Sequence, residues 1–235
     1  MTSSAGAHGR LLVVATPIGN LEDLSPRALA ALRDASLVLC EDTRRTGNLF
    51  ARYGVTTPRV SCHEHNEFRR IPEMLERLAS GETLALVSDA GTPGISDPGA
   101  HIIGLAVKNG INVIGIPGPS AVILGLVVSG MPTDRFVFEG FLPNKSAARR
   151  KRLGELRDEK RTVVLYESPH RISKALSDIL EIFGDIKVSV MRELTKKFEE
   201  TLRCGVSEAV AHFEKTKPRG EFLIVFNPKE GARDA

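Results

Sequence analysis

The sequence is poor in several residue types and patterns that would point to particular classes of protein. It has no tryptophan, two tyrosines and three cysteines in 235 residues, and no apolar run approaches the roughly 20 residues of a membrane-spanning helix. Cys40, Cys62 and Cys204 form no C-x-x-C pair, which argues against a zinc site or a disulfide framework and fits a reducing cytoplasm. The first ten residues, MTSSAGAHGR, lack an apolar core, so we expect a flexible leader over 1–10 and not a secretory signal.

Charge is unevenly distributed along the chain. The net charge is +3, yet residues 144–161 alone contain eight basic and three acidic residues, so the remainder is mildly acidic. A concentrated basic segment is typical of a surface that meets a polyanion. A solvent-exposed helix laced with ion pairs would explain the same composition, and this segment alone leaves both interpretations open.

The first half of the chain alternates between short apolar runs and helical stretches. Strands are predicted at 10–15, 36–41, 59–64, 83–89 and 112–117, with helices at 26–35, 43–53, 71–80, 97–109 and 119–129. Ser25 before Pro26 is a typical helix start, and Gly54 a typical helix end. Continuous apolar strands alternating with helices predict an α/β fold with a mostly parallel sheet buried on both faces.

The pattern changes after Ser129-Gly130-Met131-Pro132. Strands are predicted at 135–143, 161–168, 187–193, 199–205 and 221–227, with helices at 144–161, 169–183 and 206–215. The third and fourth of these strands follow each other closely, which predicts a hairpin and hence a mixed sheet. We therefore expect two α/β domains, 11–120 and 121–235.

Three loops rich in glycine and proline follow strands of the first domain: ATPIGN, SDAGTPGISDPG and IPGPSA. In a parallel sheet such loops gather at the carboxyl ends of the strands, where ligands bind, and glycine lets the backbone approach a ligand closely. None has the spacing of a dinucleotide fingerprint or a P-loop. Any one could be an ordinary turn, but the three together favour a small cofactor of another kind.

Nine segments carry a resemblance to a known family. In order they are ATPIGNLEDLSPRA, EDTRRTGNLF, HEHNE, LVSDAGTPGISDPG, IPGPSA, GFLPNK, YESPHR, RELTKKFEE and RGEFLIVF. From about Leu11 to Phe226 the chain resembles the ribosomal RNA small subunit methyltransferase I family, within the tetrapyrrole methylase superfamily. The resemblance implies a homodimer of two-domain α/β chains with S-adenosylmethionine in the cleft between the domains. It also implies methylation of a cytidine ribose 2′-hydroxyl in the decoding region of small-subunit ribosomal RNA.

The resemblance also implies a set of cofactor-binding residues. They are Pro17, Ile18, Gly19, Ser88, Asp89, Ala90, Thr92, Ser120 and Ala121 from the loops, with Tyr166 and Met191 from the second domain. The types suit the ligand, because a carboxylate such as Asp89 can accept hydrogen bonds from ribose hydroxyls or an ammonium group. Ser120 lies at a predicted helix start, where backbone N–H groups favour a carboxylate. For Tyr166 and Met191, core packing is the competing interpretation.

Candidates for catalysis lie in segments specific to this family. A ribose hydroxyl is a poor nucleophile while protonated, so a base or a cation that lowers its pKa would help. The candidates are Glu41, Arg44, His65 and Glu167. For Glu41 and Glu167 a structural ion pair or cap is an equally open interpretation. His63 and His65 alternate on one predicted strand face, but no third ligand at metal spacing is evident, so no metal is expected.

A ribosomal RNA substrate gives the basic segment a role. Lys145, Arg149, Arg150 and Arg152 are the expected phosphate contacts, with an assembled subunit as the expected substrate, while the scarcity of aromatic residues argues against a broad base-stacking platform. Two alternatives stay open: a corrin-type tetrapyrrole methylase of the same superfamily, and a non-catalytic RNA-binding assembly factor with the same fold.

Overall fold

The computed structural model describes residues 9–229, and these form parts of two compact units, Met1–Ser120 and Ala121–Ala235. Most of the leader expected over 1–10 lies outside the described residues, and Arg10 already belongs to the first strand. Each unit has its own sheet and its own buried core. Within the described residues no helix is both long and apolar enough to cross a membrane.

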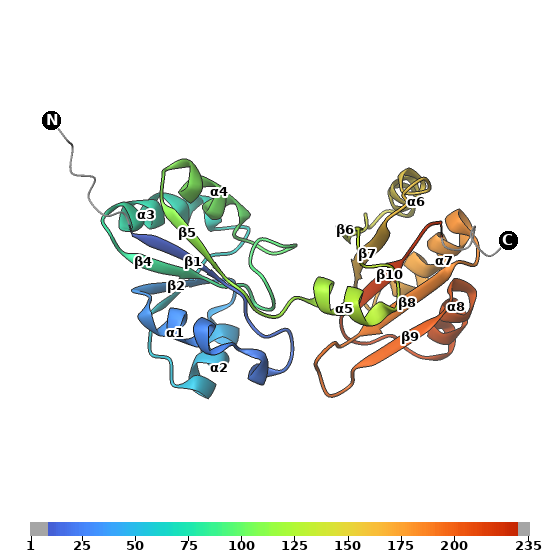
Figure 1. The fold of residues 1–235 in the computed structure, drawn as a ribbon, viewed down its shortest axis with the longest axis horizontal. Coiled ribbons are helices and arrows are strands. Elements are labelled where there is room, and N and C mark those ends of the chain that lie inside the picture. Colours follow the sequence, from blue (N-terminus) through green and yellow to red (C-terminus); the bar gives the residue numbers. More distant parts are fainter. Residues whose placement is uncertain (1–8, 230–235) are drawn as a thin grey trace. The chain divides into compact units, whose positions relative to one another are not determined.

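The first unit is built on a five-stranded parallel sheet (Figure 1). Its strands are β1 (Arg10–Val14), β2 (Leu37–Cys40), β3 (Arg59–Ser61), β4 (Thr83–Leu86) and β5 (Asn112–Ile116), in the order β3-β2-β4-β1-β5. Its helices are η1 (Leu21–Asp23), α1 (Pro26–Asp34), α2 (Thr43–Tyr53), α3 (Glu67–Ala79) and α4 (Ala100–Lys108). All four strand pairings are parallel, so the predicted α/β class is confirmed.

Side chains that alternate along the strands fill two separate cores. Leu12 and Val14 of β1 pack with α1 and α2, whereas Leu11 packs with α3 and α4. Because successive strand residues point to opposite faces, both faces of the sheet are buried. This explains why the strands read as unbroken apolar runs.

Two helices of this unit begin and end as the sequence predicts. The Ser25 hydroxyl accepts a hydrogen bond from the Ala28 N–H at 3.1 Å, with Pro26 in the first turn. The Asp42 carboxylate accepts from the Arg44 N–H at 2.8 Å, and α2 ends at Gly54, whose φ of +61° is in the left-handed region. These contacts satisfy backbone groups that a helix end leaves without intrahelical partners.

The start of α3 corrects the sequence prediction. The helix begins at Glu67 and contains Pro72, whereas the sequence predicts a start at Ile71. Strand β3 is also shorter than predicted and ends at Ser61. His63 and His65 therefore lie in the turn before α3 and not on a strand face, so the alternation argument for a histidine pair does not apply to them.

The second unit has a mixed five-stranded sheet in the order β6-β7-β10-β8-β9. The strands are β6 (Phe136–Phe141), β7 (Thr162–Glu167), β8 (Lys187–Arg192), β9 (Glu200–Gly205) and β10 (Phe222–Phe226); the helices are α5 (Ala121–Ser129), α6 (Ser146–Glu155), α7 (Ile172–Phe183) and α8 (Val206–Lys215). Only β6 and β7 pair in parallel, and β8 and β9 form the predicted hairpin.

Helix α5 lies close against β8 and β10 because of one glycine. A Cβ added to Gly125 would lie 1.9 Å from Leu223 Cδ2 and 3.3 Å from Met191 Sδ. Both distances are shorter than normal van der Waals separations between such atoms. The absence of a side chain at Gly125 therefore sets how near the helix can pack.

Candidate functional site

The loops that follow β1, β2, β4 and β5 meet at the carboxyl edge of the first sheet, which we define by residues 15–20, 41–45, 87–99 and 117–120. The β1 and β4 loops are joined by two backbone hydrogen bonds between Thr16 and Gly91, at 2.9 and 3.0 Å, and the Thr16 hydroxyl donates to the Ser88 carbonyl at 3.2 Å. Gly91 has a φ of +83°, a conformation that favours glycine. The long loop after β4 is thus joined to the β1 loop mainly by backbone hydrogen bonds. Its many glycines and prolines leave few side chains that could hold it by packing.

The β5 loop packs equally closely on this edge. A Cβ on Gly118 would lie 3.0 Å from the Ala15 Cβ and 3.2 Å from the Ala15 carbonyl oxygen. Because little room remains between the two backbones, any larger residue at position 118 would push the β1 and β5 loops apart. The close approach explains the glycine in IPGPSA.

Asp89 connects the β4 loop to the segment after β2. One carboxylate oxygen accepts from the Asp42 N–H at 3.0 Å, and the other lies 3.4 Å from Arg45 Nη1. The Asp89 side chain keeps 16% of its surface exposed. A carboxylate has about four acceptor positions, so Asp89 retains capacity for a ligand while bracing two loops.

Glu41 lies beside this carboxylate and is partly buried. Burial raises the pKa of Glu41 above its usual value, and the negative charge of Asp89 raises it further. A carboxylate with a raised pKa is a better proton acceptor near neutral pH than an ordinary one. Among the four catalytic candidates, Glu41 is the one whose electrostatic surroundings suit a base.

Arg44 lies on the same edge but points to solvent. Its side chain is 89% exposed and forms a two-pronged ion pair with Asp42 at 2.8 Å. The hydrogen bonds from Arg44 hold the pKa of Asp42 well below its usual range. An exposed guanidinium is available to a large substrate that reaches this edge.

The remaining loop residues predicted to bind a cofactor fall into two groups. Gly19, Ala90, Thr92 and Ser120 are exposed or half-buried along the carboxyl edge, whereas Pro17 and Ile18 are buried. Ser88 is 3% exposed, and its hydroxyl bonds the carbonyls of Ala90 and Gly91. The Ser88 side chain therefore shapes the loop, and the cofactor contact expected of this residue stays a prediction.

His63 and His65, near the end of β3, lie close to each other. His65 is exposed, and its ring centroid lies 6.0 Å from that of His63. Across residues 9–229 no group of three or more histidine, cysteine, aspartate or glutamate residues could hold a metal ion. His65 therefore lies on the carboxyl side of the sheet, and its ring contact with His63 does not assign it a role in catalysis.

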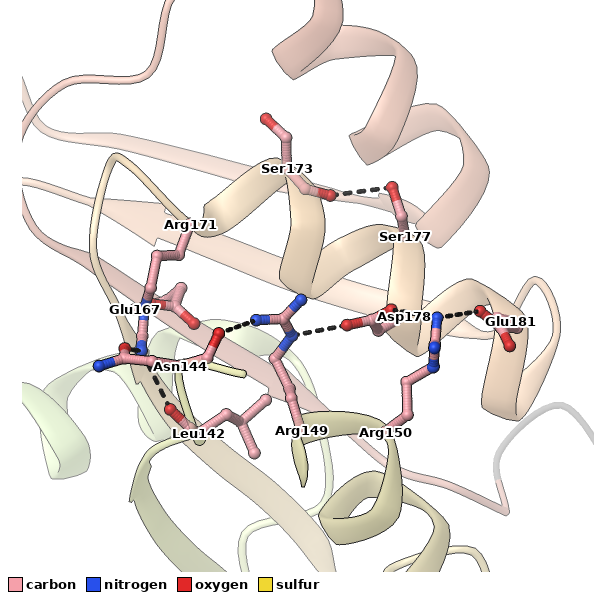
Figure 2. A network of polar contacts seen from close by, with 10 residues as sticks. All are labelled: Leu142, Asn144, Arg149, Arg150, Glu167, Arg171, Ser173, Ser177, Asp178 and Glu181. Carbon is pink, nitrogen blue, oxygen red and sulfur yellow. Dashed lines mark hydrogen bonds and ion pairs between the residues drawn. The ribbon is translucent and has the colours of Figure 1, made fainter. Parts of the chain in front are cut away.

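In the second unit, Glu167 is part of a network at the end of β7 (Figure 2). Its side chain is 1% exposed and accepts from Arg171 Nε and the Ser168 N–H, both at 2.7 Å. Arg171 also donates to the Leu142 carbonyl at 3.1 Å and to the Asn144 side chain. Glu167 Oε2 has no hydrogen-bond partner among the residues described. The main role visible for Glu167 is to hold Arg171, which in turn holds the GFLPNK loop.

Arg149 was predicted to contact phosphate, and the structure contradicts this. Its side chain is 3% exposed, and Nε lies 2.6 Å from the Asp178 carboxylate (Figure 2). Nη1 also donates to the Asn144 carbonyl at 3.3 Å. Buried charges of this kind are paired within the protein, so Arg149 fastens α6 to α7 and is removed from the set of RNA contacts.

The other basic residues in and next to α6 differ in exposure and in the ion pairs that they form. Arg150 pairs with Glu181 at 3.4 Å, and Arg152 pairs with Glu139 and Glu155, both at 2.7 Å. Lys145 and Lys151 are exposed and form no ion pair with any residue in the range 9–229. The basic segment 144–161 therefore contains both ion-paired arginines and exposed lysines without ion pairs. Both interpretations of its composition, an ion-paired helix and a surface for a polyanion, apply to part of it.

Tyr166 and Met191, expected beside the adenine, have different surroundings. Tyr166 is half-buried, with its ring centroid 5.0 Å from that of Phe138 and 5.5 Å from that of Phe141. Met191 has no exposed surface, and its sulfur lies against α5 at Gly125. The Met191 side chain is a core residue of this unit, so the competing packing interpretation holds for it.

Two of the residues that organise these segments, Thr16 and Asn144, were not predicted as site residues. Thr16 and Asp42 are bonded to the β4 loop, and Asn144 and Arg171 shape the loop after β6. Arg171 had a detectable signal, because it follows Glu167 by four residues, a spacing that suits an ion pair. Thr16 carried no comparable signal.

Known proteins similar in sequence identify the family of this chain. Residues 10–210 match the family described as Tetrapyrrole (Corrin/Porphyrin) Methylases. The chain is 49% identical over 222 residues to ribosomal RNA small subunit methyltransferase I of Thermotoga maritima, a match that covers 94% of this chain and all of that protein. It is 52% identical to the protein of the same name from Pseudomonas aeruginosa, over 92% of this chain and 78% of that one.

A solved structure supports the fold. Uroporphyrin-III C-methyltransferase from Thermus thermophilus, complexed with S-adenosylhomocysteine, superposes with a TM-score of 0.64 at 18% identity, over 97% of this chain and 100% of that one. With the family match over most of the chain and relatives near 50% identity, the protein belongs to the ribosomal RNA small subunit methyltransferase I family of tetrapyrrole methylases.

Proposed function

We propose that the protein transfers a methyl group from S-adenosylmethionine to the ribose 2′-oxygen of a cytidine in the decoding region of 16S ribosomal RNA. The observation that carries the proposal is the 49–52% identity to proteins named as small-subunit ribosomal RNA methyltransferases. Because ribosomal RNA is a cytoplasmic substrate, we also propose a cytoplasmic location. The homodimer expected from the resemblance stays a prediction.

The carboxyl edge of the first unit fits a sulfonium nucleoside. Asp89 has acceptor capacity for ribose hydroxyls or an ammonium group, and Ser120 directly precedes α5, where helical N–H groups favour a carboxylate. Gly91, with its left-handed backbone, and Gly118, with no space for a Cβ, keep side chains away from the edge. We propose that Gly19, Asp89, Ala90, Thr92, Ser120 and Ala121 contact this ligand.

When bound, S-adenosylmethionine supplies an activated methyl group, so the protein has to place the acceptor oxygen and manage one proton. Transfer requires that oxygen within about 3 Å of the methyl carbon and in line with the bond that breaks. We propose that Glu41 takes the proton of the 2′-hydroxyl, because burial and the Asp89 charge raise its pKa and make it a better proton acceptor near neutral pH. Glu167 is already committed to Arg171 and is proposed to position the loop after β6.

The RNA contacts are proposed to come from exposed cations of both units. Lys145 and Lys151 on α6 and Arg44 after β2 are exposed, and Arg150 and Arg152 keep part of their surface accessible despite their ion pairs. Phosphate contacts position an RNA without reading its sequence. Recognition of one cytidine therefore needs further contacts to bases or to the shape of the RNA.

The test is methyl transfer from labelled S-adenosylmethionine to small ribosomal subunits that lack the modification, followed by mapping of 2′-O-methylated positions. We expect one modified cytidine in the decoding region, and its loss with Asp89→Asn. Transfer to a tetrapyrrole but not to RNA would replace the proposal with the corrin-type alternative. RNA binding without any transfer would identify an assembly factor instead.

A further inference from the structure

An aromatic pair stands on the surface of the first unit beside the carboxyl edge. The Phe68 side chain is 68% exposed, and its ring centroid lies 4.9 Å from that of the exposed His101 with an interplanar angle of 44°. Phe68 follows the turn after β3, and His101 follows the 88–99 loop by two residues. The pair therefore borders the two segments that contain HEHNE and SDAGTPGISDPG.

A buried carboxylate holds these two rings together. Glu67 is 2% exposed, and its Oε1 accepts a hydrogen bond from the Ile102 N–H at 3.2 Å. Glu67 precedes Phe68 in the chain and Ile102 follows His101, so this bond fastens the first turn of α3 to the first turn of α4. The two helix starts that carry the rings are thus fixed relative to each other before any ligand arrives, which lowers the entropy lost on binding.

Two exposed arginines lie in segments of this edge that border the pair. Arg69 is exposed and forms no ion pair with the residues described, 9–229. Arg45, at the start of the neighbouring α2, keeps 67% of its side chain exposed. Because β2 and β3 are adjacent and parallel, the segments after them lie on the same edge. A single aromatic pair among cations differs from the wide apolar patches that mark protein interfaces.

We propose that Phe68 and His101 form a stacking site for a nucleobase of single-stranded RNA, next to the nucleotide that is methylated. The inference rests on the proposed function for the identity of the RNA. Sequence-specific RNA recognition commonly splays unstacked bases onto aromatic side chains. Arg69 is the adjacent phosphate contact. The low aromatic content excludes a broad platform, but two fixed rings are enough for one base.

The experiment measures affinity for a fluorescently labelled single-stranded oligoribonucleotide of decoding-region sequence at several salt concentrations. Phe68→Ala is expected to weaken binding about 5- to 100-fold, the range found for loss of one stacked base. The slope of log affinity against log salt should not change, because no charge is lost. Arg69→Gln should instead reduce that slope by about 0.7. Phe68→Tyr, which keeps the ring, should bind as the original protein does.

Val107→Ala is the matched control, because Val107 is also on α4 and is 62% exposed. It should leave RNA affinity unchanged. An oligoribonucleotide with an abasic site should lose affinity for the original protein and lose little more for Phe68→Ala. Equal loss with Phe68→Ala and Val107→Ala would overturn the inference, as would a Phe68 effect seen only with protein-containing subunits, which would indicate a protein contact.

Calorimetry with S-adenosylhomocysteine separates this inference from the proposed function. Phe68→Ala should bind that ligand as the original protein does. If the original protein shows Phe68-dependent RNA binding but takes up no such ligand and transfers no methyl group, the proposed function fails and the stacking site stands. If the protein transfers a methyl group to RNA and its RNA affinity does not depend on Phe68, the stacking site fails and the proposed function stands.

Discussion

The two units hold their candidate functional segments by different means. In the first unit the loops are joined by backbone hydrogen bonds, such as those between Thr16 and Gly91, and by one partly exposed carboxylate, Asp89. In the second unit the loop after β6 and helix α6 are held by buried ion pairs, Glu167 with Arg171 and Arg149 with Asp178. Backbone bonding leaves side chains such as Asp89 available for a ligand, whereas buried ion pairs commit theirs to the fold. The buried charges of the second unit should therefore affect stability, whereas the partly exposed Asp89 charge of the first unit should affect ligand binding.

The largest effect is expected from breaking the buried pair of the second unit. Arg149→Ala leaves the Asp178 carboxylate, 8% exposed, without its nearest partner, and removing one member of a buried pair costs about 3–5 kcal/mol. The free energy of unfolding from urea titration should fall by about that amount. Arg150→Ala is the control: it removes a half-exposed guanidinium that lies 3.4 Å from Glu181 and 3.8 Å from the same Asp178 carboxylate, and it should cost less than about 1 kcal/mol.

Replacing the buried ion pair by an apolar pair tests the same interpretation more strictly. A double variant with Arg149→Met and Asp178→Leu removes both charges together and should regain most of the lost stability. If Arg149→Ala instead weakens RNA binding without affecting unfolding, then the pair does not serve the fold and the comparison between the units is wrong.

The second effect concerns ligand affinity in the first unit. Asp89→Asn keeps an acceptor for the Asp42 N–H but removes the charge, so stability should change by less than about 1 kcal/mol. A hydrogen bond to a charged group contributes about 1.5–3 kcal/mol, so calorimetry should show S-adenosylhomocysteine bound about 10- to 100-fold more weakly. Asp134→Asn, an exposed aspartate of the second unit, should leave this affinity unchanged. A large loss of stability in Asp89→Asn would contradict the distinction between the units.

The third effect is on the salt dependence of RNA binding. Lys145→Ala combined with Lys151→Ala removes two exposed lysines of the basic segment that form no ion pair within residues 9–229, and each phosphate contact to a single strand contributes about 0.7 to the log–log slope. The slope should fall by about 1.4, twice that contribution, with the unfolding free energy nearly constant. An unchanged slope would remove α6 from the RNA-contacting surface and leave it as an ion-paired helix.

The smallest effect is on the pH dependence of stability. Burial and the Asp89 charge raise the pKa of Glu41 above 4.5, so the folded state binds this proton more tightly than the unfolded state. The resulting stabilisation is present below pH 4.5 and is lost as the pH rises through the folded-state pKa. In Glu41→Gln this loss should be absent when unfolding is compared between about pH 4 and about pH 7. An identical pH profile in both proteins would show that the Glu41 carboxylate has an ordinary pKa.

The sequence was sufficient for most of the fold. Unbroken apolar strands predicted the parallel sheet, and the close spacing of the strands at 187–193 and 199–205 predicted the hairpin of β8 and β9. The start of α3 was misplaced because Pro72, a frequent first-turn residue, lies inside the helix, while the turn at His63–Asn66 that begins it depends on bonds to Ser61 and His63.

For the candidate site, the residue types were easier to predict than their surroundings. The loop with Asp89 and Gly91 was found from its glycine and proline content, which leaves few side chains to pack. The burial of Arg149 could not be found, because it depends on Asp178, 29 positions away on another helix. Met191 was misassigned for the same reason, because its burial depends on Gly125 and Leu223.

The division of the chain between Ser120 and Ala121 has an evolutionary consequence. Each side of that peptide bond has a complete core, and among the described residues no strand of one sheet is supplied by the other side. Gene recombination at this position would exchange one whole half while leaving the hydrophobic interior of the other untouched. Such modular inheritance would let new acceptor molecules be acquired without rebuilding the half that contains the glycine-rich loops.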